Sequence, residues 1–254
     1  MNFNLKVRYF VDLAFKGSNY HGWQRQDNAN SVQAEIEKAL STYFSEAVEV
    51  FGAGRTDTGV HASHMVLHFD LENEIDLDAA CFQINAILPN DIAFHRIRKV
   101  KEDFHARFSA TARTYRYHIH QKKNPFVHGH SYFFRPKLDM DQMNQAAEKL
   151  IGKQDFSCFS KSNTQTFTND CEIRTAIWVK VEEDRYYFEI TADRFLRNMV
   201  RAIVGTLIEI GQGKRSQNSM LDLIASKDRK KAGYSVPADG LFLHHIEYPA
   251  EGFI

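Results

Sequence analysis

The chain lacks the features that mark membrane-spanning, secreted and zinc-stabilised proteins. No apolar run among its 254 residues approaches the roughly 18 residues that a membrane-spanning helix needs. Its first residues, 1–6, lack the apolar core of a signal peptide. Its three cysteines, Cys81, Cys158 and Cys171, lie far apart and form no C-x-x-C pair, which argues against a disulfide framework and a structural zinc site. These absences predict a cytoplasmic protein with no membrane segment.

A net charge is missing as well, but the charges are unevenly spread. The 32 basic residues balance 32 acidic ones, which at first argues against a nucleic-acid partner. Residues 96–123, however, hold nine Lys or Arg against two acids, and residues 70–78 hold five acids and no base. Aromatic side chains are interspersed among the bases: Phe104, Phe108, Tyr115 and Tyr117. A neutral protein of this pattern can still present a basic, aromatic surface to a polyanion.

Hydrophobic periodicity in the first half predicts the element order β-α-β-β-α-β. Alternating apolar residues predict the strands, and stripes of apolar residues behind the capping residues Asn30 and Asp76 predict the helices. The expected elements are a strand at 6–15, a helix from Asn30 to Tyr43, strands at 47–51 and 60–69, a helix from Asp76 to Leu88, and a strand at 92–100.

The second half follows the same order. The expected elements are a strand at 113–120, a helix capped by Asp139, strands at 172–181 and 185–192, a helix at 195–210, a short helix at 219–225, and a strand at 241–248. The pattern predicts an α+β fold of duplicated ferredoxin-like (RRM-like) halves, 1–108 and 109–254. We expect the halves to form one mostly antiparallel sheet with a central basic cleft.

One loop between two predicted strands stands out as a candidate site. It reads Gly52-Ala-Gly-Arg-Thr-Asp-Thr-Gly-Val-His61 and places Arg55 two residues before Asp57. Its glycines permit tight turns or close approach to a ligand. Asp-Thr-Gly is also ordinary turn chemistry, in which an aspartate binds nearby backbone amides. From these residues alone, both interpretations stay open.

Six further motifs lie in a characteristic order around this loop. They are Gly22-Trp-Gln24, Asn85-Ala-Ile-Leu-Pro-Asn-Asp-Ile92, Phe104-His-Ala-Arg-Phe-Ser-Ala110, Arg113-Thr-Tyr-Arg-Tyr117, Met199-Val-Arg201 with Ile203-Val-Gly205, and Asp239-Gly-Leu-Phe-Leu243. Together with the loop they resemble the tRNA pseudouridine synthase A (TruA) family over nearly the whole chain.

The resemblance implies an isomerase that converts uridine to pseudouridine at positions 38 to 40 of the tRNA anticodon arm. The bond between N1 of the base and the ribose breaks, and the base is rejoined to the ribose through C5. No redox change occurs, so no cofactor and no metal are expected. Family members act as homodimers on tRNA. The alternative is a non-catalytic RNA-binding protein of the same fold, which would not need Asp57.

The resemblance also assigns roles to individual residues. Asp57 is the expected catalytic carboxylate, acting either as a nucleophile or as a base toward the ribose. Residues expected to contact the target nucleotide or Asp57 are Arg55, Tyr115, Arg201 and Leu243. Residues expected to contact RNA are Arg25, Arg107 and Arg113. Of the two strand tyrosines, Tyr115 is assigned to the site, and Tyr117 to the core.

Three histidines, His61, His64 and His68, have spacings that suggest a metal site on a helix. They fall in a strand pattern, where His61 points opposite to the other two. We therefore expect polar strand faces and no metal. The polar stretch 163–169 has no clear period and is either an RNA-contacting loop or a connector.

Overall fold

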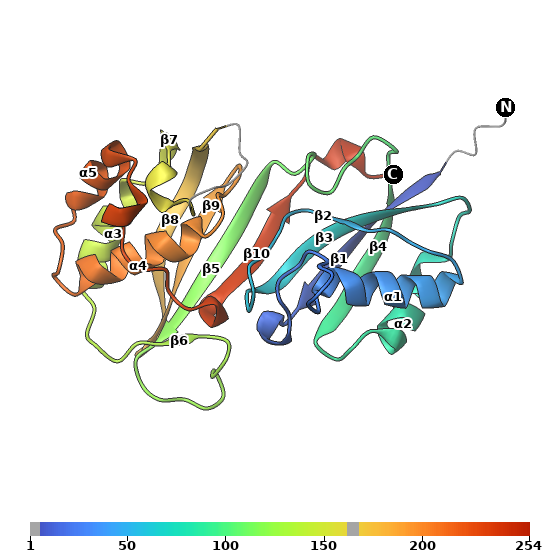
Figure 1. The fold of residues 1–254 in the computed structure, drawn as a ribbon, viewed down its shortest axis with the longest axis horizontal. Helices are drawn as coiled ribbons and strands as arrows, with labels where there is room; N and C mark the ends of the chain where they lie inside the picture. The colour runs from blue at the N-terminus through green and yellow to red at the C-terminus, as the bar shows by residue number, and fades with distance from the viewer. Residues whose placement is uncertain (1–5, 162–167) are drawn as a thin grey trace. The chain divides into compact units, whose positions relative to one another are not determined.

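The fold was analysed in a computed structural model, which describes residues 6–161 and 168–254. In these residues the fold is mixed α+β, with mostly antiparallel strand pairs and five α-helices (Figure 1). The chain divides into two compact units. Unit 1 comprises Met1–Thr111 and Leu243–Ile254, and unit 2 comprises Ala112–Phe242. Part of the 163–169 stretch lies outside the described residues.

Unit 1 is built on a sheet with the strand order β4-β1-β3-β10. The strands are β1 (Val7–Phe15), β2 (Phe51–Gly52), β3 (His61–Leu71), β4 (Ile92–Val100) and β10 (Leu241–Glu247). Strand β1 is antiparallel to both β3 and β4, and the short β2 adds to β3. The strands predicted from alternation are confirmed except at 47–51, where only Phe51 pairs as part of a strand.

Two helices lie side by side against this sheet, α1 (Val32–Phe44) and α2 (Leu77–Ile87) (Figure 1). Four residues of the predicted stripe of α1 are buried, and the fifth, Tyr43, is half-buried. The predicted cap Asn30 is wrong, because Ser31 has the extended backbone of an N-cap and its hydroxyl accepts from Ala34 N. The Asp76 cap of α2 is confirmed, since its side chain accepts from Ala79 N.

Unit 2 contains the strand order β5-β9-β8-β7. Its strands are β5 (Ala112–His120), β6 (Tyr132–Phe133), β7 (Gly152–Asp155), β8 (Asp170–Glu182) and β9 (Arg185–Ala192). Strands β5, β9, β8 and β7 pair antiparallel in turn, whereas β6 lies parallel to β5. The sequence did not predict β6 or β7, and their presence departs from a simple repeat of the first half. The duplicated ferredoxin-like arrangement therefore stays a prediction.

The helices of unit 2 are α3 (Met140–Glu148), α4 (Met199–Gly211) and α5 (Ser219–Ser226). The Asp139 cap of α3 is confirmed. The predicted start of α4 at Phe195 is wrong: Asn198 adopts the left-handed conformation (φ 67°), and the helix begins only after it, at Met199. Almost every side chain of α4 is buried, so this helix forms the centre of the unit.

Candidate active site

The predicted loop begins where β2 pairs with β3. Phe51 is opposite His68 and Gly52 is opposite Leu67, and Ala53 N then donates to Val66 O at 2.8 Å. A Cβ on Gly52 would lie 2.5 Å from the indole of Trp23, closer than real Cβ contacts allow. Glycine at this position therefore lets the buried Trp23 pack directly on the base of the loop.

The rest of the loop packs against the segment before α1. Trp23 N donates to Thr56 O, and Gly59 N donates to Tyr20 O. Gly22 has a φ of +96°, and a Cβ on it would come within 2.3 Å of Thr56 O. Only glycine satisfies both conditions, so the motif Gly22-Trp-Gln24 and the loop form one packed structure.

A tyrosine and an aspartate anchor this segment to the turn that leads into β4. Tyr20 Oη donates to Asp91 Oδ1 at 2.6 Å, and Asp91 O accepts from Lys16 N at 2.8 Å. Burial and the bond to Asp91 raise the pKa of the Tyr20 phenol, so it remains a neutral donor. The role of Tyr20 was missed from the sequence, although Asp91 lies in one of the recognised motifs.

Asp57 opens a tight turn at the tip of the loop. Val60 N donates to the main-chain O of Asp57 at 3.1 Å, and Gly59 supplies the positive φ (79°) that the turn needs. The main chain thus closes this turn without the carboxylate. Asp57 is half-buried and Arg55 is exposed. The loop therefore presents an acidic and a basic side chain on a backbone held by neighbouring segments.

The segment 104–110 packs beside β3 in the same unit. Phe104 stacks on Phe10 at 5.0 Å, and Ala106 N donates to Nδ1 of the buried His68 at 3.2 Å. Arg107 is exposed, and its guanidinium lies 5.6 Å from the ring centroid of Phe108. The predicted RNA-contacting Arg107 thus lies at the surface beside an exposed aromatic ring.

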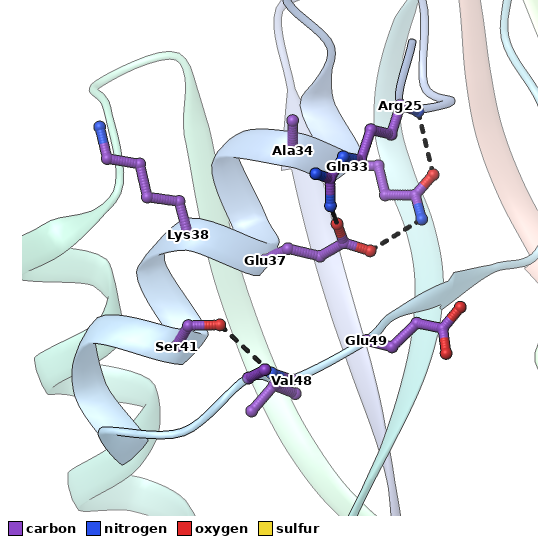
Figure 2. A pocket seen from close by; sticks show the side chains of 9 residues that line it. Arg25, Gln33, Ala34, Glu37, Lys38, Ser41, Val48 and Glu49 are labelled. Carbon is purple, nitrogen blue, oxygen red and sulfur yellow. Dashed lines mark hydrogen bonds and ion pairs between the residues drawn. The ribbon is translucent and has the colours of Figure 1, made fainter. Parts of the chain in front are cut away.

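Arg25 lies at the rim of an open hollow of about 610 Å³ beside α1 (Figure 2). Its guanidinium Nη1 lies 3.3 Å from Glu37 Oε2, and its backbone N donates to Gln33 Oε1 at 3.1 Å. Its side chain is 71% exposed, which leaves it within reach of a ligand. From the sequence, Gln33 was expected only to pair with Asn30 in a capping box, and Glu37 had no expected role, although their i, i+4 spacing on a predicted helix was the available signal.

Leu243 is buried in β10 of unit 1, with 2% of its surface exposed. Ser63 Oγ donates to Leu243 O at 3.4 Å, which ties β10 to β3. Burial of this kind suits a core leucine. The predicted contact with uracil remains a prediction.

The three strand histidines were expected to form polar strand faces, but two of them are buried. His61 and His68 are buried, and the Nδ1 of each accepts a main-chain N–H, from Gly17 and Ala106 respectively. His64 Nδ1 accepts from Ile246 N, and its Nε2 contacts Asp12 at 3.1 Å. Each ring therefore links separate segments of unit 1.

Residues 6–161 and 168–254 contain neither a metal-binding cluster nor a membrane-spanning helix. Across these two stretches, no group of three or more His, Cys, Asp or Glu side chains is arranged to hold a metal ion. Nor does any helix in the same stretches have the length and hydrophobicity needed to cross a bilayer.

In unit 2, the two strand tyrosines have the different environments expected for them. Tyr117 is fully buried and donates to Pro237 O at 2.9 Å, which confirms its place in the core. Tyr115 is half-buried, and its ring lies edge-on to Phe195 at 5.1 Å. Part of the Tyr115 side chain thus remains accessible to a substrate.

Arg201 projects from the first turn of α4 and is half-buried. Its Nε donates to Val236 O at 2.7 Å, and its own O accepts from Val236 N. Gly205, one turn further on, lets residue Tyr234 approach so closely that a Cβ would lie 1.8 Å from its carbonyl. The 233–236 segment therefore orients Arg201 through direct backbone contact.

Arg113 lies at the start of β5 and is half-buried. Its Nη1 donates to Asp193 O at 2.9 Å, so its head is oriented by a carbonyl. The predicted residues thus fall into two groups. Unit 1 holds Arg25, Arg55, Asp57, Arg107 and Leu243, and unit 2 holds Arg113, Tyr115 and Arg201.

A carboxylate on a backbone-held loop, two residues after an arginine, defines a class of site suited to acid–base or nucleophilic chemistry. Comparison with known proteins identifies the family. The family model for tRNA pseudouridine synthase matches residues 13–109 and 146–249. The chain belongs to the tRNA pseudouridine synthase family, whose members are isomerases, and this confirms the resemblance drawn from the sequence.

Several relatives carry the name tRNA pseudouridine synthase A. The protein from Bacteroides thetaiotaomicron is 51% identical over 97% of this chain and 92% of its own length. That from Porphyromonas gingivalis is 47% identical over 98% of this chain and 100% of its own length. A more distant relative from Aliivibrio salmonicida is 42% identical over 96% and 94%. The similarity therefore covers both units.

Proposed function

We propose that this protein isomerises uridine to pseudouridine at positions 38 to 40 of the tRNA anticodon stem-loop, with Asp57 as the catalytic carboxylate. The observation that carries the proposal is the match to tRNA pseudouridine synthase A over nearly the full chain. The construction of the Asp57 loop supports it, since three backbone hydrogen bonds to two neighbouring segments hold that loop in place.

The reaction breaks the bond between N1 and C1′ and forms one between C5 and C1′. C5 loses its hydrogen as a proton and N1 gains one, so no electrons are exchanged with a cofactor. A carboxylate can serve as nucleophile or as proton acceptor, and both routes need it ionised. Arg55, Tyr115, Arg201 and Leu243 are proposed to hold the target nucleotide and the carboxylate.

A uridine inside a stacked helix must leave the stack before its C1′ can react, at a cost of a few kcal/mol. Arg55, exposed on the same loop as Asp57, is suited to take the place of the extruded base. The partly exposed ring of Tyr115 is suited to stack on the extruded base. Arg25, Arg107 and Arg113 are proposed to contact the RNA backbone, in a homodimer working in the cytoplasm.

The test uses tRNA tritiated at uracil C5, with no added metal or nucleotide. Formation of the new bond expels that hydrogen, so tritium in water reports the isomerisation. Release by the wild type and none by Asp57→Ala is the expected result. Release by both would remove Asp57 from its role. Binding without release by either would favour a non-catalytic RNA-binding protein.

Position is tested by mapping pseudouridine in the product. Transcripts in which uridines 38, 39 and 40 are replaced one at a time by cytidine should lose only the corresponding modification. Modification elsewhere in the tRNA, with these three sites unchanged, would contradict the anticodon-arm assignment while leaving the reaction class intact.

A further inference from the structure

We propose that Gln33 and Glu37, one turn apart on α1, are positioning residues for the Gly52–His61 loop. The inference rests on the proposed function, because it gives the geometry of that loop a part in the reaction. Neither side chain belongs to the loop. Figure 2 shows the two side chains on α1, bonded to each other and to Arg25.

The Gln33 amide uses both of its donors and its acceptor. Nε2 donates to Val50 O at 3.1 Å and to Glu37 Oε1 at 2.9 Å, while Oε1 accepts from Arg25 N at 3.1 Å. A side-chain amide has two N–H groups, so both are satisfied here. The Gln33 side chain thereby joins the segment before α1 to Val50, the residue just before β2.

Glu37 completes the arrangement from the same face of the helix. Its side chain is 12% exposed, and its Oε1 accepts from Val50 N at 3.4 Å as well as from Gln33. A carboxylate removed from water is costly unless such donors surround it. Both main-chain polar groups of Val50 are therefore bound by side chains of α1.

These contacts reach the loop from both sides. Val50 is two residues before Gly52, where the loop starts. On the other side, the Gln33 side chain holds Arg25 N, two residues after Trp23, and Trp23 N donates to Thr56 O, next to Asp57. Val50, at the entry to the loop, and Thr56, just before Asp57, are thus both held through contacts that lead to one turn of α1.

The hydrogen bonds made by the Gln33 and Glu37 side chains form a polar bracket. This bracket is separate from the packing that holds α1 in the fold. Four other side chains of α1, Val32, Ile36, Ala39 and Leu40, are buried in the core. The helix therefore stays in place without the two polar residues. A displacement of about 1 Å in a catalytic group can cost about 100-fold in rate, so loss of the bracket should be seen in turnover.

The experiment measures single-turnover tritium release with enzyme in saturating excess over tRNA, together with tRNA Kd and thermal stability. The variants are Gln33→Leu, which keeps the bulk and removes every hydrogen bond, and Glu37→Ala with its conservative partner Glu37→Gln. The control is Gln154→Leu in unit 2. Its amide also donates to backbone carbonyls, those of Lys149, Leu150 and Ile151.

We expect Gln33→Leu and Glu37→Ala to slow the single-turnover rate by tenfold or more, on the order allowed by a small displacement, while Kd changes little. Glu37→Gln should recover most of the rate lost in Glu37→Ala, because an amide oxygen still accepts from Val50 N. Gln154→Leu should lower Tm without this loss of rate.

The inference is overturned if Gln33→Leu and Glu37→Ala lose only thermal stability, as the control does, and keep the wild-type rate. It is also overturned if the rate loss disappears when the enzyme concentration is raised further above the measured Kd, because the effect would then be one of affinity. Absence of release by the wild type is a different result, because it would refute the proposed function first and the inference with it.

Discussion

At the scale of single residues, unit 1 uses histidine as a buried acceptor. His61, His64 and His68 each accept a main-chain N–H through Nδ1, from three separate segments. A neutral imidazole can do this, whereas a protonated one has two donors and no acceptor. The bond from Ala106 N to His68 therefore couples the fold of unit 1 to the neutral state of this ring.

His68 gives this coupling a measurable consequence. Burial, reinforced by Arg8 and His105 and opposed by Asp70, lowers the pKa of His68 to about 4. An unfolded histidine binds its proton near pH 6.5, so between these values the unfolded chain holds more protons. Stability that is complete above pH 6.5 should fall by about 2–3 kcal/mol at pH 4.5, at roughly 1.4 kcal/mol per pH unit.

Urea unfolding of the wild type and of His68→Gln between pH 7 and pH 4.5 checks this. The glutamine oxygen can still accept from Ala106 N, but it does not titrate. The variant should show a clearly shallower loss of stability with acid. His95→Gln, at an exposed position of β4, is the control and should keep the wild-type slope. Equal slopes for all three proteins would contradict the assignment.

At the scale of elements, local signals predicted most helices and strands. The caps Asp76 and Asp139 were correct because an aspartate that begins an apolar stripe satisfies free helix amides. The choice of Asn30 over Ser31 failed because adjacent capping residues cannot be ranked without the backbone. Asn30 instead donates to Asn19 O.

Other elements lack any local signal. Strand β7 carries Lys153 and Gln154, so it shows no apolar alternation, and it exists because β8 pairs with it. The two-residue β6 depends in the same way on β5. For the site, the loop motif could be recognised in the sequence. The contacts by which Gln33 and Glu37 support it join residues 8 to 17 positions apart. Such contacts follow from packing and not from periodicity.

Helix α4 provides a test of close packing. A Cβ on Gly205 would lie 1.8 Å from the carbonyl oxygen of Tyr234, a backbone atom that cannot move alone. Gly205→Ala should therefore destabilise the protein by about 1–3 kcal/mol or more. It should also displace the 233–236 segment that orients Arg201. Chemical unfolding measures the first effect.

The matched control lies in the same helix. A Cβ on Gly211 would meet the sulfur of Met143 at 2.4 Å, but this is the flexible end of a side chain that can move aside. Gly211→Ala should cost much less, because alanine also favours the helix by up to about 1 kcal/mol. Similar losses in the two variants would show that the contact with Tyr234 is not the cause.

At the scale of the whole molecule, the zero net charge hides an opposition between the units. Unit 1 has 11 basic and 17 acidic residues, a net charge of −6, and unit 2 has 21 and 15, a net charge of +6. The net charge of the whole chain therefore argued against a polyanionic partner. The division into units shows that unit 2 by itself is basic, as a polyanion-binding part should be. Attraction to RNA at long range should come mainly from unit 2.

Binding of tRNA should depend steeply on salt for this reason. Each phosphate contact releases counterions, so the slope of log K against log salt concentration should fall by about 0.7–0.9 when one contact is removed. We expect this change for Arg107→Ala and Arg113→Ala, measured by filter binding across a salt series. Lys214→Ala removes an exposed lysine outside residues 96–123 that is not assigned to RNA, and it should leave the slope nearly unchanged. The same change in all three variants would mean that affinity responds to overall charge, and that Arg107 and Arg113 make no specific phosphate contacts.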